Sequence, residues 1–71
     1  MNDIIINKPT VELFKILKFE GLASSGGEAK SMIAEGQVKL NGQVETQKRK
    51  KINAGDTITF AGQNYAIKTA E

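Results

Sequence analysis

The sequence predicts an α+β domain in which two helices pack on a small antiparallel sheet of two hairpins. Apolar residues recur at helical spacing in the first half of the chain, and the period changes to two after Gly36. Two turn signals, Asn41-Gly42 and the stretch 61–64, each separate alternating segments. A chain of 71 residues forms one domain, residues 1–71, and its margin of stability is small.

The first helix is predicted to follow Pro9 and to end at Gly21. Thr10 can cap its start, and Glu12 suits the positive end of the helix dipole. Phe14 lies off the apolar stripe, so we expect it to pack at the flank of the core. The buried face of this helix is formed by Leu13, Ile16 and Leu17.

The second helix has a clearer start signal. Ser25 and Glu28 are spaced as a capping box, in which each side chain accepts a hydrogen bond from the other residue's backbone amide. This pairing sets the helix start at Gly26, and Gly36 ends the helix. Its buried face is formed by Ala29, Met32 and Ile33.

The second half of the chain predicts short strands. Val38 and Leu40 alternate with polar residues before Asn41-Gly42, and Val44 and Thr46 continue the alternation on the return strand. A loop then holds the basic run, and a turn forms at Ala54-Gly55-Asp56. The second hairpin pairs Ile58 and Phe60 with Tyr65 and Ile67, and Ile4 to Ile6 fit an added edge strand.

Composition excludes several function classes. The chain has no cysteine and no histidine, which rules out disulfides, imidazole catalysis and the usual zinc sites. The serines have no histidine partner, the carboxylates show no paired spacing, and we expect the conspicuous lysines to be exposed. We therefore expect a non-catalytic protein with no metal, cofactor or small-molecule substrate. The N-terminal residues show neither a signal peptide nor a membrane span, so we expect a cytoplasmic protein. Because two helices would cover one face of the sheet, we expect a monomer.

Positive charge is concentrated in one run. Lys48, Arg49, Lys50 and Lys51 are four of the ten basic residues, and the rest of the chain holds six lysines against eight carboxylates. Such a local block favours a polyanionic partner, although a solvated loop would have the same composition. Lys39, on the polar face of the first hairpin, and Lys15 could extend the block; Glu12 can instead pair with Lys15.

Gly26 and Gly27 stand in the first turn of the second helix, where backbone amides lack partners. Lys30 is one turn further and can reach back over them. Lysine, bare backbone and a helix N-terminus would suit a phosphate. A sharp turn between the helices would also use two glycines, and the residues alone leave both explanations open.

The stretch from Leu13 to Ile58, with LFKILKFEGLASSGGEAKSMIAEGQVKLNG and KINAGDTI, resembles a known family. This is the RNA-binding domain first described in small-subunit ribosomal protein S-four, also called the alpha-L RNA-binding motif. The resemblance covers about two thirds of the chain, with a motif core at about residues 10 to 60. GGEAK, KRKK and AGD look like the stand-alone bacterial subfamily of small YbcJ-like and YaaA-like proteins.

The resemblance implies RNA binding by the helix pair and the first hairpin, with Lys15, Lys30 and Lys39 at positions that are commonly basic in the family. Gly26 and Glu12 stand where arginines are usual, so the basic run would replace part of that charge. The expected partner is structured RNA, either ribosomal or tRNA-like. Ribosomes or ribosome-associated proteins are expected as further partners of the protein. The residues expected to bind it are Lys15, Gly26, Gly27, Lys30, Lys39, Lys48, Arg49, Lys50 and Lys51. The alternative is a module that docks on an acidic protein, and charge alone does not distinguish RNA from duplex DNA.

Overall fold

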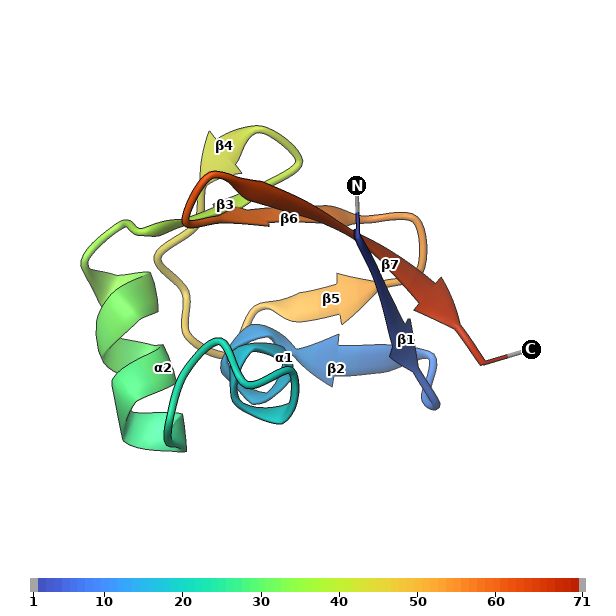
Figure 1. The fold of residues 1–71 in the computed structure, drawn as a ribbon, viewed down its shortest axis with the longest axis horizontal. Coiled ribbons are helices and arrows are strands. Elements are labelled where there is room, and N and C mark those ends of the chain that lie inside the picture. The colour runs from blue at the N-terminus through green and yellow to red at the C-terminus, as the bar shows by residue number, and fades with distance from the viewer. Residues whose placement is uncertain (1, 71) are drawn as a thin grey trace.

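The structure is a computed structural model that describes residues 2–70 (Figure 1). In chain order the elements are β1 (Asn2–Ile6), β2 (Thr10–Glu12), α1 (Leu13–Phe19), α2 (Gly26–Ala34), β3 (Val38–Leu40), β4 (Gln43–Val44), β5 (Lys51–Asn53), β6 (Thr57–Phe60) and β7 (Gln63–Thr69). They form a five-stranded sheet in the order β1-β7-β6-β3-β4 and a two-stranded sheet of β2 and β5. In Figure 1, α1 and the small sheet lie below the large sheet, and α2 stands at one end of both.

The predicted fold class is confirmed, and the turns form where their residues require. Asn41 and Gly42 both have positive φ angles, 51° and 87°, and join β3 to β4. This backbone matches the two-residue hairpin turn that Asn-Gly favours. The second hairpin turns more tightly than expected, at Ala61-Gly62 alone, because Phe60 already pairs with Gln63.

The expected edge strand is present as β1, and it makes the large sheet mixed. β1 runs parallel to β7, with Ile4 opposite Ile67, whereas every other pairing in this sheet is antiparallel. Ile4 and Ile6 are buried, while Ile5 between them is 55% exposed. This alternation is the period-two pattern of a strand with one face on the core.

The core lies between the two layers and confirms the apolar faces expected from the sequence. Met32 is only half-buried and packs at the rim. Ile52 at the centre of β5 is fully buried as well. The buried residues are Ile4, Ile6, Leu13, Ile16, Leu17, Ala23, Ala29, Ile33, Val38, Ile52, Ile58 and Ile67.

The start of the first helix differs from the prediction. Thr10 does not cap it, because Thr10 to Glu12 form strand β2 and pair with β5, and the helix begins at Leu13 with Glu12 as its N-cap. Glu12 is extended, with φ −68° and ψ 141°, and its side chain makes no capping hydrogen bond. A three-residue strand is too short to show an alternation, so the local sequence does not distinguish it from the start of the helix that follows.

Two strand boundaries also differ. The return strand of the first hairpin ends at Val44 and does not include Thr46, and the basic run is a loop only up to Lys50, since Lys51 begins β5. Lys51 lies opposite Glu12 in the β2–β5 pair. That cross-strand pairing depends on the fold and not on local sequence. Within residues 2 to 70, no helix is long and apolar enough to cross a membrane.

Candidate functional site

The basic loop is held against the N-terminus of α1. The backbone N–H of Leu13 donates to the carbonyl of Lys50 at 2.9 Å, and the N–H of Phe14 donates to the carbonyl of Lys48 at 3.1 Å. The first amides of a helix have no partner within it, and Glu12 offers no side-chain cap. The loop carbonyls satisfy these amides, so the helix start fixes the position of the basic loop.

Three cationic side chains from different elements surround the ring of Phe14. Lys30 from α2 places its Nζ 4.6 Å from the ring centroid, Arg49 from the basic loop its Cζ at 5.7 Å, and Lys15 from α1 its Nζ at 5.9 Å. All three lie within the range of cation–π attraction, about 6 Å. We call Phe14, Lys15, Lys30 and Arg49 the Phe14 cluster.

The Phe14 cluster concentrates positive charge on a small surface. Phe14 and Lys30 are half-buried, whereas Lys15 and Arg49 are exposed. Like charges gathered around one ring repel each other, and within residues 2–70 only the Lys15 charge of this cluster forms an ion pair, with Glu12 at 3.3 Å. Each exposed cation–π contact offsets this repulsion by about 0.5–1 kcal/mol. An anionic ligand at this surface would relieve the repulsion further.

The glycine turn touches the Phe14 cluster. A Cβ added to Gly26 would lie 3.8 Å from ring atoms Cδ2 and Cε2 of Phe14, which is ordinary contact, and at Gly27 it would meet only Ser25 Oγ at 3.9 Å. Neither glycine has a positive φ, unlike Gly21 and Gly36 at the helix ends. The backbone conformation of these two residues is therefore open to any L-amino acid.

Of the two hydrogen bonds in the predicted capping box of α2, one forms and the other does not. Ser25 Oγ accepts from the backbone N–H of Glu28 at 3.1 Å, as expected. The Glu28 carboxylate, however, accepts from the backbone N–H of Ser24 at 3.1 Å and from its hydroxyl at 2.9 Å, not from the amide of Ser25. These bonds to Ser24, the backbone one first, lower the pKa of Glu28 below its usual 4.5. Glu28 thus keeps a negative charge beside the glycine turn.

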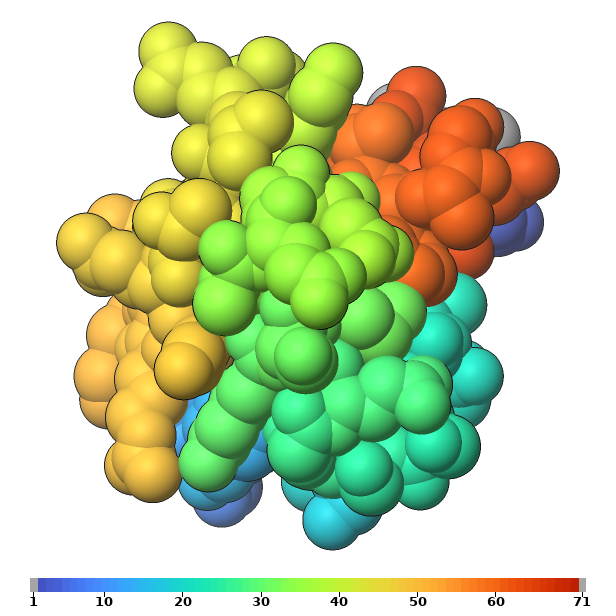
Figure 2. All heavy atoms as spheres, turned by 90° about the vertical axis from the view of Figure 1, so that its left-hand side faces the viewer, coloured from blue at the N-terminus to red at the C-terminus, as the bar shows by residue number. Residues whose placement is uncertain are grey.

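The remaining predicted lysines lie outside the Phe14 cluster, on the basic loop, β5 and β3. Lys48 and Lys51 are exposed on either side of the half-buried Lys50, and Lys39 is exposed on β3 opposite Val44. Figure 2 shows one face of the molecule in which the gold segment of the basic loop lies beside the green α2, with the yellow-green hairpin above them. The helix, the loop and the hairpin therefore present one continuous surface.

The sequence alone did not identify Phe14 as the residue whose ring the three cationic side chains contact. The one available signal was that Phe14 lies off the apolar stripe of the helix. The packing expected from that position is confirmed, because the ring packs at the flank of the core. The arrival of Lys30 and Arg49 depends on how α2 and the basic loop meet α1. That meeting is a tertiary contact with no local signature.

A family model described as S4 domain matches residues 4–68. The chain belongs to the S4 domain family. Over 59 residues, its S4 domain is 56% identical to YbcJ of Escherichia coli (strain K12), and this alignment covers 83% of this chain and 84% of YbcJ. YbcJ of Shigella flexneri matches to the same extent.

Solved structures agree with this S4 domain assignment. The solution structure of E. coli YbcJ, reported to reveal an alpha-L motif involved in RNA binding, superposes with a TM-score of 0.71 and 51% identity, covering 96% of this chain and 87% of that one. The 30S ribosomal protein S4e of Thermoplasma acidophilum gives a TM-score of 0.70 with 26% identity, covering 84% of this chain and 32% of that one. The S4 domain fold of this chain thus occurs both in a small protein and within a longer ribosomal one.

Proposed function

We propose that this protein binds structured RNA through the phosphate backbone and does so without catalysis. Membership of the S4 domain family supports RNA as the partner, as does the RNA-binding motif reported for YbcJ. The observation that carries the site is the Phe14 cluster, where three cations from three elements approach one ring within 5.9 Å. The RNA class we favour is ribosomal or tRNA-like.

The Phe14 cluster suits a phosphate group because its charges are already in place. Long lysine and arginine side chains lose rotamer freedom when they bind, up to about 2 kcal/mol each. Contact with the Phe14 ring restricts Lys30 and Arg49 before the ligand arrives, so less freedom remains to be lost. Phosphate contacts made in this way position an RNA but do not read its sequence.

The neighbouring residues extend this contact. Lys39, Lys48, Lys50 and Lys51 lie on the elements that flank the Phe14 cluster, and each adds charge for a further phosphate. Gly26 lies against the Phe14 ring, whereas exposed Gly27 leaves the backbone at the start of α2 uncovered and lets an RNA strand approach the first amides of the helix. The helix N-terminus adds favourable potential there, although Glu28 opposes it.

Fluorescence anisotropy with a labelled, folded RNA fragment tests this function. With about five phosphates neutralised, the slope of log affinity against log salt should lie between about −3 and −5. Lys30→Gln and Arg49→Gln should each weaken binding and make this slope shallower by about 0.7–0.9. Phe14→Leu should also weaken binding, because it keeps the apolar packing but removes the ring that gathers the cations.

Lys68→Gln is the matched control. It removes the same charge from β7, where Lys68 pairs with Asp3 at 3.2 Å outside the proposed interface. If Lys68→Gln weakens binding as much as Lys30→Gln, attraction is diffuse and the Phe14 cluster is not the site. If a duplex DNA binds as tightly as the RNA, the proposed preference for RNA is wrong. If a complex isolated from cells survives nuclease treatment, an acidic protein is the favoured partner.

A further inference from the structure

Phe19, the last residue of α1, has an exposed ring. It is 70% exposed, more than Ile5 or Val44 at 55% each. Single exposed apolar residues are common on proteins and need no explanation. Phe19 differs because its ring forms one wall of a hollow on the surface.

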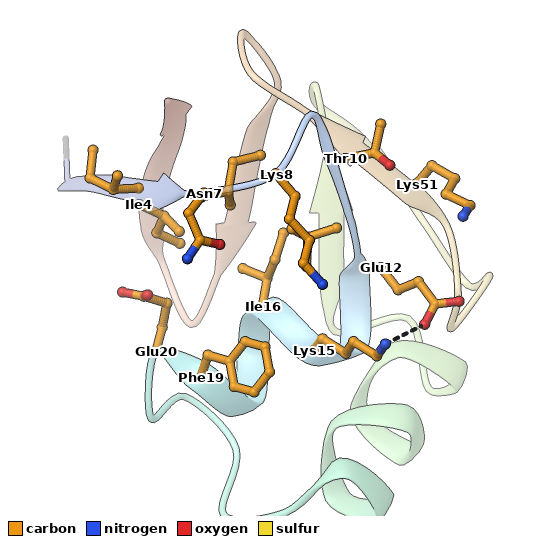
Figure 3. Close-up of a pocket in the computed structure, with 13 residues that line it drawn as sticks. Ile4, Asn7, Lys8, Thr10, Glu12, Lys15, Ile16, Phe19, Glu20 and Lys51 are labelled. Atoms are coloured by element: carbon orange, nitrogen blue, oxygen red, sulfur yellow. Dashed lines mark ion pairs between the residues drawn. The ribbon is translucent and has the colours of Figure 1, made fainter. Parts of the chain in front are cut away.

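The hollow lies between α1 and the N-terminal segment, and its volume is about 410 Å³. That volume falls within the range of about 300 to 1,000 Å³ seen for small-molecule sites. Figure 3 shows Phe19 and Ile16 on the α1 side, Ile4 and Asn7 on the β1 side, and Lys8 extending across the space between them. Buried Ile4, Ile6 and Ile16 are among the lining residues. The Asn7 amide supplies both a donor and an acceptor.

The rim of the hollow carries more positive than negative charge and shares Lys15 with the Phe14 cluster. Lys8, Lys15 and Lys51 line it, together with the acidic groups of Glu12 and Glu20. Glu12 and Lys15 form an ion pair at 3.3 Å and offset each other, so Lys8 and Lys51 carry the remaining positive charge of the rim against Glu20. Lys15 belongs both to the hollow and to the Phe14 cluster. A polyanionic strand bound at the cluster can therefore continue into the hollow along a basic path.

We propose that the hollow takes one unpaired base of the bound RNA, which stacks on the Phe19 ring. This inference rests on the proposed function. Lys8 and Lys15 contact the phosphates next to that base, and the Asn7 amide hydrogen-bonds its edge. Proteins commonly recognise unpaired bases by stacking them on aromatic rings and hydrogen-bonding their edges. The S4 domain would then have two kinds of contact, one to phosphates of a folded RNA and one to a base beside it.

A pair of RNAs tests the inference. One is a blunt hairpin, and the other is the same hairpin with a short single-stranded overhang that contains the fluorescent base 2-aminopurine. The wild-type protein should bind the second RNA more tightly and change the 2-aminopurine emission. Phe19→Ala should weaken binding of the overhang RNA by about 5- to 150-fold, the range of one lost base stack, and should leave the blunt hairpin unaffected.

Phe19→Tyr is the matched control, because it keeps the ring and should keep both the affinity and the 2-aminopurine response. Lys8→Gln should weaken binding of the overhang RNA and leave binding of the blunt hairpin unchanged. If Phe19→Ala binds both RNAs like the wild type, the hollow holds no base while the proposed function stands. If the wild type binds neither RNA, the proposed function fails and the inference with it. A Phe19-dependent complex with an acidic peptide, with no response from the overhang, also overturns the inference.

Discussion

Replacing Gly27 by alanine separates two reasons for a glycine at the start of α2. If the glycine is needed for a turn, alanine destabilises the protein. The structure predicts the opposite, because Gly27 lies in a helix without a positive φ and an added Cβ meets only Ser25 Oγ at 3.9 Å. Alanine in a helix is favoured over glycine by up to about 1 kcal/mol. For a domain of this size, a gain of 0.5–1 kcal/mol raises Tm by about 2–8 °C.

Thermal denaturation followed by circular dichroism measures this gain, and RNA anisotropy measures the cost to binding. If an RNA strand approaches the bare backbone, the new methyl group lies in its path, so Gly27→Ala should be more stable and bind more weakly. Gly42→Ala is the control: Gly42 has φ 87°, and the same change there should lower Tm. A lower Tm for Gly27→Ala refutes the structural reasoning, and an unchanged affinity refutes the backbone contact.

Three further changes test the fold and the interface. Ile52→Ala should reduce the free energy of unfolding by about 2–5 kcal/mol in urea, because Ile52 is fully buried; a smaller loss would mean that β5 contributes little to the core. Glu28→Gln should remove a stabilisation that is present above pH 4.5. Because the pKa of Glu28 is lowered in the folded protein, the unfolded chain binds the proton more readily. The difference in Tm between wild type and Glu28→Gln should therefore fade as the pH drops through the folded-state pKa. An advantage that persists at pH 2 would contradict this. Lys39→Gln should make the salt slope of RNA binding shallower by about 0.7–0.9, and an unchanged slope would remove Lys39 from the interface.

Local signals in the sequence were sufficient for much of the fold. Asn41-Gly42 forms the expected hairpin turn because its positive φ angles suit these residues. Ser25 caps α2 because its side chain reaches the free amide of Glu28 within one turn. Each of these features depends on residues close together in the chain, which is why sequence reasoning finds them.

Features that depend on distant residues were missed. β2 and β5 are three residues long, and each becomes a strand only because the other is there to pair with it. The α1 amides that Thr10 was expected to help cap are bonded instead by carbonyls of a loop more than 30 residues away. One local detail was also missed: Glu28 bonds to Ser24 and not to Ser25, because both the amide and the hydroxyl of Ser24 lie within its reach.

The candidate site shows the same limit. Charge counting singled out the basic run, and the structure shows its loop hydrogen-bonded to the start of α1. It could not show that Arg49, rather than its neighbours, would stand over Phe14, or that Lys30 would do so from the other helix. Phe19 was likewise not distinguished from the other aromatic residues, because its exposure follows from where α1 ends.

A two-dimensional amide NMR titration of the labelled protein tests the central claim most directly, with a folded RNA and a matched DNA duplex at two salt concentrations. We predict that the largest shifts fall on Phe14, Gly26, Gly27, Lys30 and Arg49, are larger for RNA than for DNA, and shrink as salt rises. If these amides stay in place while only Lys48, Lys50 and Lys51 respond, binding is diffuse and the Phe14 cluster is not an RNA site.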